Sequence, residues 1–133
     1  MKGSYVLLLH MPENRHICIG SLGEIYFAAG YYAYVGSAMN GIEKRVERHK
    51  RKEKRMRWHI DHLLAHAQLT AVFFRESIQK EEEEIAATFL ENGFSFIPHF
   101  GSGDSKCASH LFYSQDAEPF HIILKNLHMQ QML

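Results

Sequence analysis

The stretch GYYAYVGSAMNGIEKRVERH, residues 30–49, decides the fold because its periodicity changes halfway along. Residues 31–35 are aromatic and β-branched and lie between Gly30 and Gly36, which is typical of a strand bounded by turns. Side chains suited to an inward face then recur at helical spacing, at Ile42, Val46 and His49. The stretch therefore predicts a strand followed by a helix, as in a domain that mixes sheet and helix.

The predicted helix begins near Gly41 and carries a strongly basic run. Asn40, followed three residues later by Glu43, resembles a capping box. Residues 44–57 hold nine basic and two acidic residues, a local net charge of +7, although the fifteen basic and fifteen acidic residues of the whole chain cancel. Such a run is typical of a face that binds a polyanion, because neutralised phosphates release counterions. A solvated helix face is the alternative interpretation.

Working outward, the remaining patterns predict an α+β domain. Strands are predicted at 5–9, 17–19, 25–28, 69–74, 94–97 and 111–113. A second short helix is predicted over 58–67, and 101–105 reads as a loop. We expect a small, mainly antiparallel sheet of three core strands, with an inserted strand pair at 17–27 and helices flanking it.

Two further helices are predicted in the second half of the chain. The first has an apolar stripe made of Ile78, Ile85, Phe89 and Leu90. Glu82 lies on the same stripe, where a carboxylate costs free energy unless it is paired or coordinates a cation. Alternatively, Glu82 marks the edge of the stripe and reaches water. The last helix should be capped by Asp116 and packs through Phe120, Ile123, Leu124 and Leu127.

Length and composition indicate one folded domain over residues 1–133. Hydrophobic residues make up 46% and charged residues 23% of the chain, close to globular averages. No apolar run reaches the roughly 18 residues of a membrane span. Residues 1–9 contain an apolar stretch only at 5–9, which is too short for a secretory signal. Cys18 and Cys107 lack CxxC partners, which fits a reducing compartment. We therefore expect a cytoplasmic protein that does not associate with membranes.

Several side chains have the chemistry to act on a phosphodiester. Arg45 and His49 are spaced i,i+4 and share one face of the predicted helix. They would present a guanidinium and an imidazole to a phosphate, and a guanidinium matches phosphate oxygens in pairs. Tyr5 and Tyr34 lie at the ends of strands, so their phenols could approach each other.

These motifs occur in an order that resembles the GIY-YIG nuclease superfamily. GSY at 3–5 occupies the position of the GIY motif, and YVG at 34–36 occupies that of the YIG motif. The chain is most similar to the stand-alone branch called Uri-type endonucleases, whose members also occur fused to base-excision glycosylases. The similar stretches cover most of the chain, namely GYYAYVGSAMNGIEKRVERH (30–49), WHIDHLL (58–64), EEEIAATFL (82–90) and HFGSGDSKCASHLFY (99–113).

The resemblance implies an endonuclease that hydrolyses DNA phosphodiester bonds, nicking one strand, in DNA repair or processing. The resemblance does not decide between DNA and RNA as the substrate. The implied catalytic residues are Tyr5, Tyr34, Arg45, His49 and Glu82, with Glu82 as the ligand of Mg²⁺ or Mn²⁺. One tyrosine, by preference Tyr34, would orient or deprotonate the attacking water with help from His49. Nucleic-acid contacts are expected from Gly36, Ser37, Lys44, Arg48, Lys50, Arg51 and His110.

Two other groups of histidines have spacings that could suit a metal site. Cys107 and His110 have CxxH spacing, with His99 upstream, but a zinc site would need further ligands. His59, His62 and His66 share a helix face without an obvious acidic partner, and a structural role is favoured.

Two alternatives to the enzyme remain: a non-catalytic nucleic-acid-binding or adaptor domain that uses the basic run, and a domain that self-associates through its acidic and basic patches.

Overall fold

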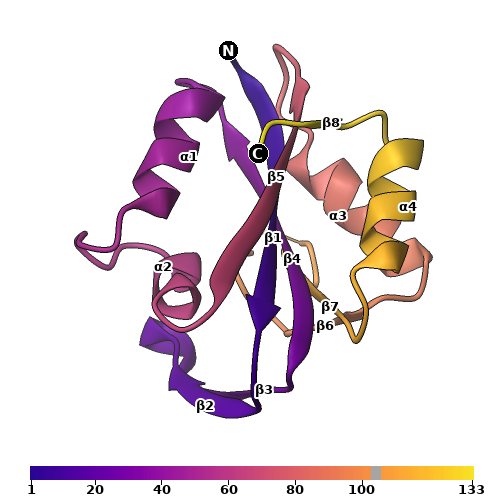
Figure 1. The fold of residues 1–133 in the computed structure, drawn as a ribbon. Helices are drawn as coiled ribbons and strands as arrows, with labels where there is room; N and C mark the ends of the chain where they lie inside the picture. Colours follow the sequence, from indigo (N-terminus) through magenta and orange to yellow (C-terminus); the bar gives the residue numbers. More distant parts are fainter. Residues whose placement is uncertain (103–105) are drawn as a thin grey trace.

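The computed structural model describes residues 1–102 and 106–133, and its centre is an antiparallel sheet. Within these residues the sheet has six strands in the order β6-β7-β4-β1-β5-β8 (Figure 1). The long strands are β1 (Gly3–Met11), β4 (Gly30–Ala38) and β5 (Gln68–Glu76). β4 pairs along one side of β1 and β5 along the other, so β1 is a central strand. The short strands are β6 (Ser95–Phe96), β7 (Leu111–Ser114) and β8 (Gln130–Gln131).

The α+β class, the mainly antiparallel sheet and the inserted strand pair are confirmed. β2 (Arg15–Cys18) and β3 (Glu24–Phe27) form a separate two-stranded sheet between the two tyrosine motifs. A 3-10 turn, η1 (Gly20–Leu22), joins them. The helices of the described residues are α1 (Ile42–Lys50), α2 (His59–Leu64), α3 (Glu82–Glu91) and α4 (Glu118–Asn126). In the parts of the chain that are described, no helix has the length and apolar character needed to cross a membrane.

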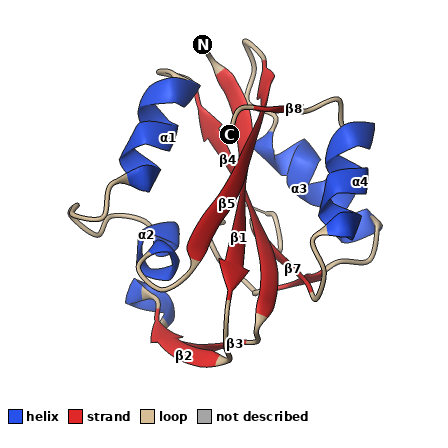
Figure 2. Ribbon diagram, in the orientation of Figure 1, coloured by secondary structure: helices blue, strands red, loops and turns tan. Residues whose placement is uncertain are grey.

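The helices cover both faces of the sheet, with α1 and α2 on one face and α3 and α4 on the other (Figure 2). This arrangement follows from the uninterrupted apolar character of β1, because successive side chains of a strand point to opposite faces. Tyr5 and Leu7 pack in a core cluster with side chains of α1 and α2. Val6 and Leu8 pack in a second cluster with side chains of α3 and α4. The first of these faces carries both motif tyrosines.

The start of α1 differs from the prediction. Gly41, with φ of 125°, precedes the first helical turn, and no side chain caps it, so the predicted capping box of Asn40 and Glu43 is wrong. The Met1 carbonyl instead accepts the backbone N–H of Ile42 at 2.7 Å. The Met1 amine binds the Glu43 carboxylate at 2.7 Å. The segment leading into β1 therefore satisfies the helix end that a local cap would have satisfied.

The end of α1 also departs from the expected basic helix. The helix ends at Lys50, so only the first half of the run 44–57 is helical. Lys54, in the loop beyond, folds back and donates hydrogen bonds to the carbonyls of Arg48 and His49 at 3.2 and 2.8 Å. A lysine at a helix C-terminus satisfies the last carbonyls and favours the negative end of the helix dipole. The second half of the basic run is thereby held against the end of α1.

Two details of the second half of the chain were predicted wrongly. α3 begins at Glu82, and Ile78 lies before it with 86% of its surface exposed, so Ile78 does not belong to the apolar face. Leu90 is exposed as well. The buried residues of α3 are Ile85, Ala86 and Phe89. Asp116 does not cap α4, since Ala117 occupies the capping position without a side-chain hydrogen bond.

Candidate active site

The two motif tyrosines lie side by side on adjacent strands. β1 and β4 pair so that Tyr5 is opposite Gly36 and Leu7 is opposite Tyr34. Both tyrosines point to the face covered by α1 and α2, and both are buried. Their ring centroids are 6.5 Å apart. The predicted approach of the two phenols is therefore present in the structure.

Gly36 makes this arrangement possible because it leaves room for the Tyr5 ring. A Cβ built at position 36 would overlap that ring and would lie 2.5 Å from its hydroxyl oxygen. Overpacking of this kind forces either the strand or the aromatic ring to move. Gly36 is itself buried, so its clearest role is to let Tyr5 lie across β4. Contact with nucleic acid at this glycine stays a prediction.

His49 is the direct partner of Tyr5. The Tyr5 hydroxyl and His49 Nε2 are 2.8 Å apart. Burial, followed by the positive charge of Lys54, lowers the pKa of His49 to about 3, so the imidazole is neutral. Its Nδ1 is buried and has no hydrogen-bond partner within the described residues. The sequence placed His49 near the site through its i,i+4 spacing from Arg45, and the structure adds that it pairs with Tyr5 and not with Tyr34.

We expect the His49 imidazole to stay neutral from about pH 8 down to about pH 5. In NMR titrations its ring signals should not shift over this range in the folded protein, whereas in urea they should titrate near the ordinary value of 6.5. Because the folded pKa is depressed, this group contributes stability above pH 6.5 that is lost as the pH falls towards 3. A spectrum of His49→Gln assigns the signal. Titration of the folded signal above pH 5 would contradict this interpretation.

Arg45 reaches the end of β4 from α1. Its Nη1 donates a hydrogen bond to the Ser37 carbonyl at 3.1 Å, and its guanidinium carbon lies 4.6 Å from the centre of the Trp58 ring. Burial raises the pKa of Tyr5 to about 12, and the charge of Arg45 opposes that rise. Burial, followed by the neighbouring Tyr5, also raises the pKa of Tyr34. Both phenols are therefore protonated at neutral pH, next to a fixed positive charge.

The end of β4 is an open edge of the sheet. β7 pairs with β4 only from Tyr31 to Tyr34, and the Val35 amide bonds to the His110 carbonyl beyond it. From residue 36 onward, β4 has no strand on that side in the described parts of the chain. Ser37 lies in this segment, and its hydroxyl is buried without a hydrogen-bond partner in the described structure. An extended ligand could approach the backbone here, as at other sheet edges.

Glu82 lies in the first turn of α3, which packs against β4 from the opposite face. It is half-buried and has no hydrogen bond or ion pair to any residue in 1–102 or 106–133. Burial raises the pKa of its carboxyl group, and the charge of Lys80, followed by that of Arg45, partly offsets this rise. The negative charge of Glu82 also raises the pKa of both tyrosines, although its effect is smaller than those of burial and of the Arg45 charge. The structure therefore brings Glu82 within electrostatic range of Tyr5, Tyr34 and Arg45.

A cation beside Glu82 would offset the cost of burying its charge. The described residues contain no group of three or more histidine, cysteine or acidic side chains that could hold a metal ion. One carboxylate with water in the other positions is nevertheless a common arrangement for Mg²⁺. Glu82 fits that arrangement, and Mn²⁺ accepts the same oxygen ligands. A closed zinc site in the Cys107 region does not fit the described ligands, and residues 103–105 of the predicted loop lie outside the described residues.

Arg48 has a different partner from the one expected. Its guanidinium binds both carboxylate oxygens of Asp61, at 2.8 and 3.0 Å, and lies 4.3 Å from the centre of the Trp58 ring. Asp61 also accepts the backbone N–H groups of Arg57 and Trp58. Burial opposes ionisation of Asp61, but these bonds outweigh it and hold its pKa at about 2. Arg48 thus ties α1 to α2, and its contact with nucleic acid stays a prediction.

Replacing Asp61 with asparagine should lower the free energy of unfolding by about 3 kcal/mol at pH 7, because Arg48 would lose its buried partner. Above the ordinary pKa of 3.8 the wild-type carboxylate is ionised in both states, and its depressed folded pKa contributes stability there. The difference between wild type and variant should shrink as the pH falls from 3.8 towards 2. Urea unfolding at several pH values measures this. Asp116→Asn, at an exposed position, is the control, and an equal loss in both variants would reject the role of Asp61.

The other predicted contacts are divided between surface and core. Lys44, Lys50 and Arg51 are exposed, with no ion pair to any described residue. His110 is buried, burial lowers its pKa, and its Nε2 has no partner among the residues described. His66 lies beyond the end of α2, so it does not share a helix face with His59 and His62. His59 accepts the Gly101 N–H at 2.9 Å, and His66 pairs with Arg15 at 3.2 Å.

The fold and the site define an α+β domain in which a tyrosine–histidine pair and an arginine lie near an open sheet edge, with a half-buried glutamate in electrostatic range of them. The chain belongs to the family described as a domain of unknown function, DUF123, whose family model matches residues 4–133. Neither the curated proteins nor the solved structures include a match to the chain.

Proposed function

We propose that the protein is a divalent-metal-dependent endonuclease that hydrolyses phosphodiester bonds of DNA and nicks one strand. The observation that carries the proposal is that Tyr5, Tyr34, Arg45 and His49 cluster beside β4, with Glu82 in electrostatic range of both tyrosines and Arg45. These residues come from four elements that are far apart in the sequence. They are also the residues that match the GIY-YIG motifs, so spacing, chemistry and geometry support the same site.

Arg45 and Glu82 approach the edge of β4 from opposite faces of the sheet, and each suits one part of the reaction. The Arg45 guanidinium would bind the non-bridging oxygens of the phosphate and stabilise the charge that develops on them. Glu82 would hold Mg²⁺ or Mn²⁺. When bound, the ion supplies charge that polarises the phosphate and stabilises the leaving oxygen.

The Tyr5–His49 pair is the best candidate to orient the attacking water. His49 Nε2 is 2.8 Å from the Tyr5 hydroxyl and is neutral, so it can accept the hydrogen bond of that O–H and leave the phenol oxygen to accept one from water. The imidazole, whose pKa is about 3, and the protonated phenol, whose pKa is about 12, are both poor proton acceptors at neutral pH, so the pair would position the water without deprotonating it. The sequence favoured Tyr34 for this role. Since His49 contacts the Tyr5 hydroxyl, we assign the role to Tyr5 and leave Tyr34 to line the site.

One observation favours the alternative of a non-catalytic nucleic-acid-binding domain. Both tyrosines are buried with raised pKa values, and such phenols would serve equally well as packing residues. The half-buried carboxylate of Glu82 favours the enzyme, because a domain that only binds nucleic acid has no use for a charge in that position.

Labelled DNA and RNA substrates of several structures, incubated with Mn²⁺ and either wild type or Glu82→Ala, separate these functions. The proposal expects cleavage by wild type only, with binding by both proteins. Binding without cleavage by either protein would favour the adaptor. The affinity for DNA, measured at several salt concentrations, separates nucleic-acid binding from self-association. Binding through six or more phosphates weakens by roughly 10³-fold between 50 and 200 mM salt, whereas a domain that only self-associates would show no such DNA binding.

A further inference from the structure

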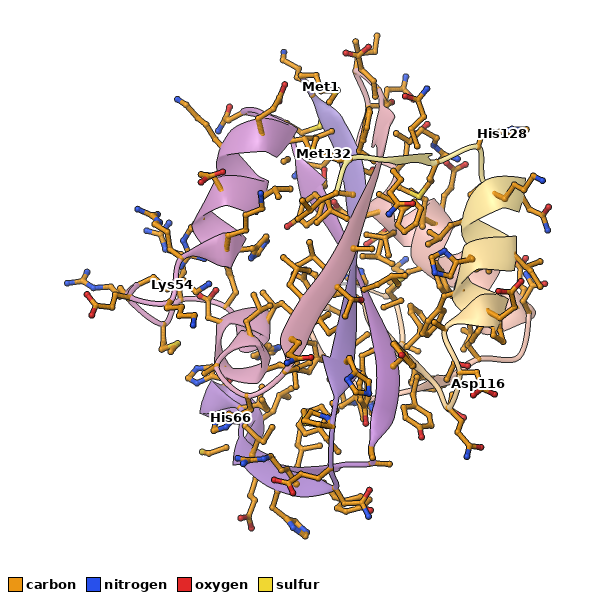
Figure 3. All side chains as sticks on the ribbon, viewed as in Figure 1. Met1, Lys54, His66, Asp116, His128 and Met132 are labelled. Atoms are coloured by element: carbon orange, nitrogen blue, oxygen red, sulfur yellow. The ribbon has the colours of Figure 1, made fainter. Side chains whose placement is uncertain are left out.

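An open cavity of about 820 Å³ lies beside the candidate active site. It is formed by the end of α1, the loop after it, α2 and the first residues of β5. Figure 3 labels two lining residues, Lys54 and His66, on the side of the molecule that carries α1 and α2. Its size falls within the range of about 300 to 1,000 Å³ that is usual for ligand pockets. It is therefore large enough for a phosphate together with part of the group it is attached to.

The charge of the cavity wall is strongly positive. Four cationic side chains at the end of α1 and just after it contribute to this charge, namely Lys50, Arg51, Lys52 and Lys54. Asp61 is the one carboxylate side chain among the described lining residues, and Arg48 and two backbone amides already occupy it. None of the four cations has an ion pair elsewhere in residues 1–102 or 106–133. The side chains of the wall thus carry more positive than negative charge.

The loop that carries these cations is anchored. Lys54 donates to two carbonyls at the end of α1, and the Arg55 carbonyl accepts a hydrogen bond from Arg48 at 3.0 Å. Arg48 is itself fixed by Asp61. Because the backbone of the loop is already held in place, binding of an anion would have to order only the side chains that contact it, and not the loop itself.

The cavity adjoins the candidate active site through His49. This residue lines the cavity, and its Nε2 bonds to the Tyr5 hydroxyl. Arg45, Tyr34 and Glu82 do not line it, so the cavity is distinct from the place where the bond would be cleaved. A nucleic-acid strand that crosses the open edge of β4 could continue past α1 to the positively charged wall of this cavity.

We propose that this cavity is a phosphate-binding site, and that it holds a phosphate of the nucleic-acid strand some distance from the cleaved bond. The assignment to nucleic acid rests on the proposed function, whereas binding of the phosphate group itself does not. Lys50, Arg51, Lys52 and Lys54 provide the charge, and the site sets how the strand is positioned across Tyr5 and Arg45.

Titration with inorganic phosphate, followed by the backbone amide signals in NMR, tests the site directly. Saturable shifts should be confined to residues 50–54 and 64–69. Arg51→Ala should weaken phosphate binding several-fold, because its side chain lines the cavity. Arg55→Ala removes the same charge from an exposed position in the same loop that does not line it, and should leave binding unchanged. Absence of these shifts, or equal losses in both variants, would overturn the proposal.

A single-stranded oligonucleotide without added metal tests the source of the phosphate. It should shift the same amides and displace inorganic phosphate. Arg51→Ala should weaken oligonucleotide binding by about fivefold at 0.15 M salt and reduce the salt slope by about 1, as expected for the loss of one phosphate contact. If the oligonucleotide leaves these amides unchanged while inorganic phosphate shifts them, the site binds free phosphates and the strand assignment is wrong.

The proposal of a phosphate-binding cavity and the proposal of nuclease activity can be rejected independently. Phosphate binding at residues 50–54 without cleavage of any substrate by wild type would retain the cavity and reject the proposed reaction. Cleavage by wild type that Arg51→Ala leaves unaffected, with no phosphate-induced shifts, would reject the cavity and retain the reaction.

Discussion

Glu82→Gln should lower the rate of Mg²⁺- or Mn²⁺-dependent cleavage by about 10³-fold, while the affinity for DNA changes by less than about twofold. Glutamine keeps the shape of the side chain but loses the negative charge that would hold the ion. Affinity should change little, because DNA binding is expected to depend on the basic residues of α1 and the following loop. Single-turnover cleavage and fluorescence anisotropy, measured on the same DNA, give the two quantities.

The matched control is Glu84→Gln, in the same turn of α3 at an exposed position. It should cleave like wild type. Thermal unfolding is a second measurement on Glu82→Gln: the folded carboxyl group has a raised pKa, so ionised Glu82 opposes folding as the pH rises, and the variant should be at least as stable as wild type at neutral pH. Full cleavage by a folded Glu82→Gln would reject the metal role, and a large loss of stability would reject the electrostatic account of this site.

Arg45→Ala should lower the cleavage rate by about 10³-fold or more, with a loss of DNA affinity of only several-fold. The guanidinium lies beside the Tyr5 hydroxyl and is oriented by the Ser37 carbonyl and the Trp58 ring. A group positioned in this way contributes most when charge develops on the phosphate. Rates at saturating DNA, compared with dissociation constants measured without metal, separate the two effects.

Arg45→Lys is the informative comparison for this residue. Lysine keeps the positive charge but loses the planar set of donors, so it should restore affinity and leave most of the rate defect in place. Turnover that persists in Arg45→Ala would contradict a catalytic role. Full recovery of turnover in Arg45→Lys would show that charge alone matters.

The sequence predicted the parts of the fold that depend on local periodicity. The strand at 31–35 and the helix that starts after residue 40 lie where the pattern changes, as expected. Gly36 and Tyr34 were singled out by their motif, and their closeness to Tyr5 follows from the pairing of β1 with β4. Glu82 was distinguished from the neighbouring acidic residues because it lay on an apolar stripe, and it is indeed half-buried.

The sequence missed features that depend on contacts between distant residues. The start of α1 is fixed by Met1, about forty positions earlier, so the local signal at Asn40 was misleading. Arg48 was predicted to contact nucleic acid, and nothing in the basic run indicates that Asp61 lies beside it. A usable signal did exist: an aspartate three residues after Trp58 is well placed to accept the free N–H groups at the start of α2. β8 has only two residues, too few to show an alternating pattern.

The position of Tyr5 on β1 has a consequence for how the site tolerates motion. A strand paired on both sides opens only when most of the domain unfolds, so its amide protons should be among the last to exchange with deuterium. The first turn of α3 follows an exposed segment and can open locally. The phenol is therefore anchored to the most persistent part of the molecule, whereas the Glu82 carboxylate lies on a segment that is less firmly held.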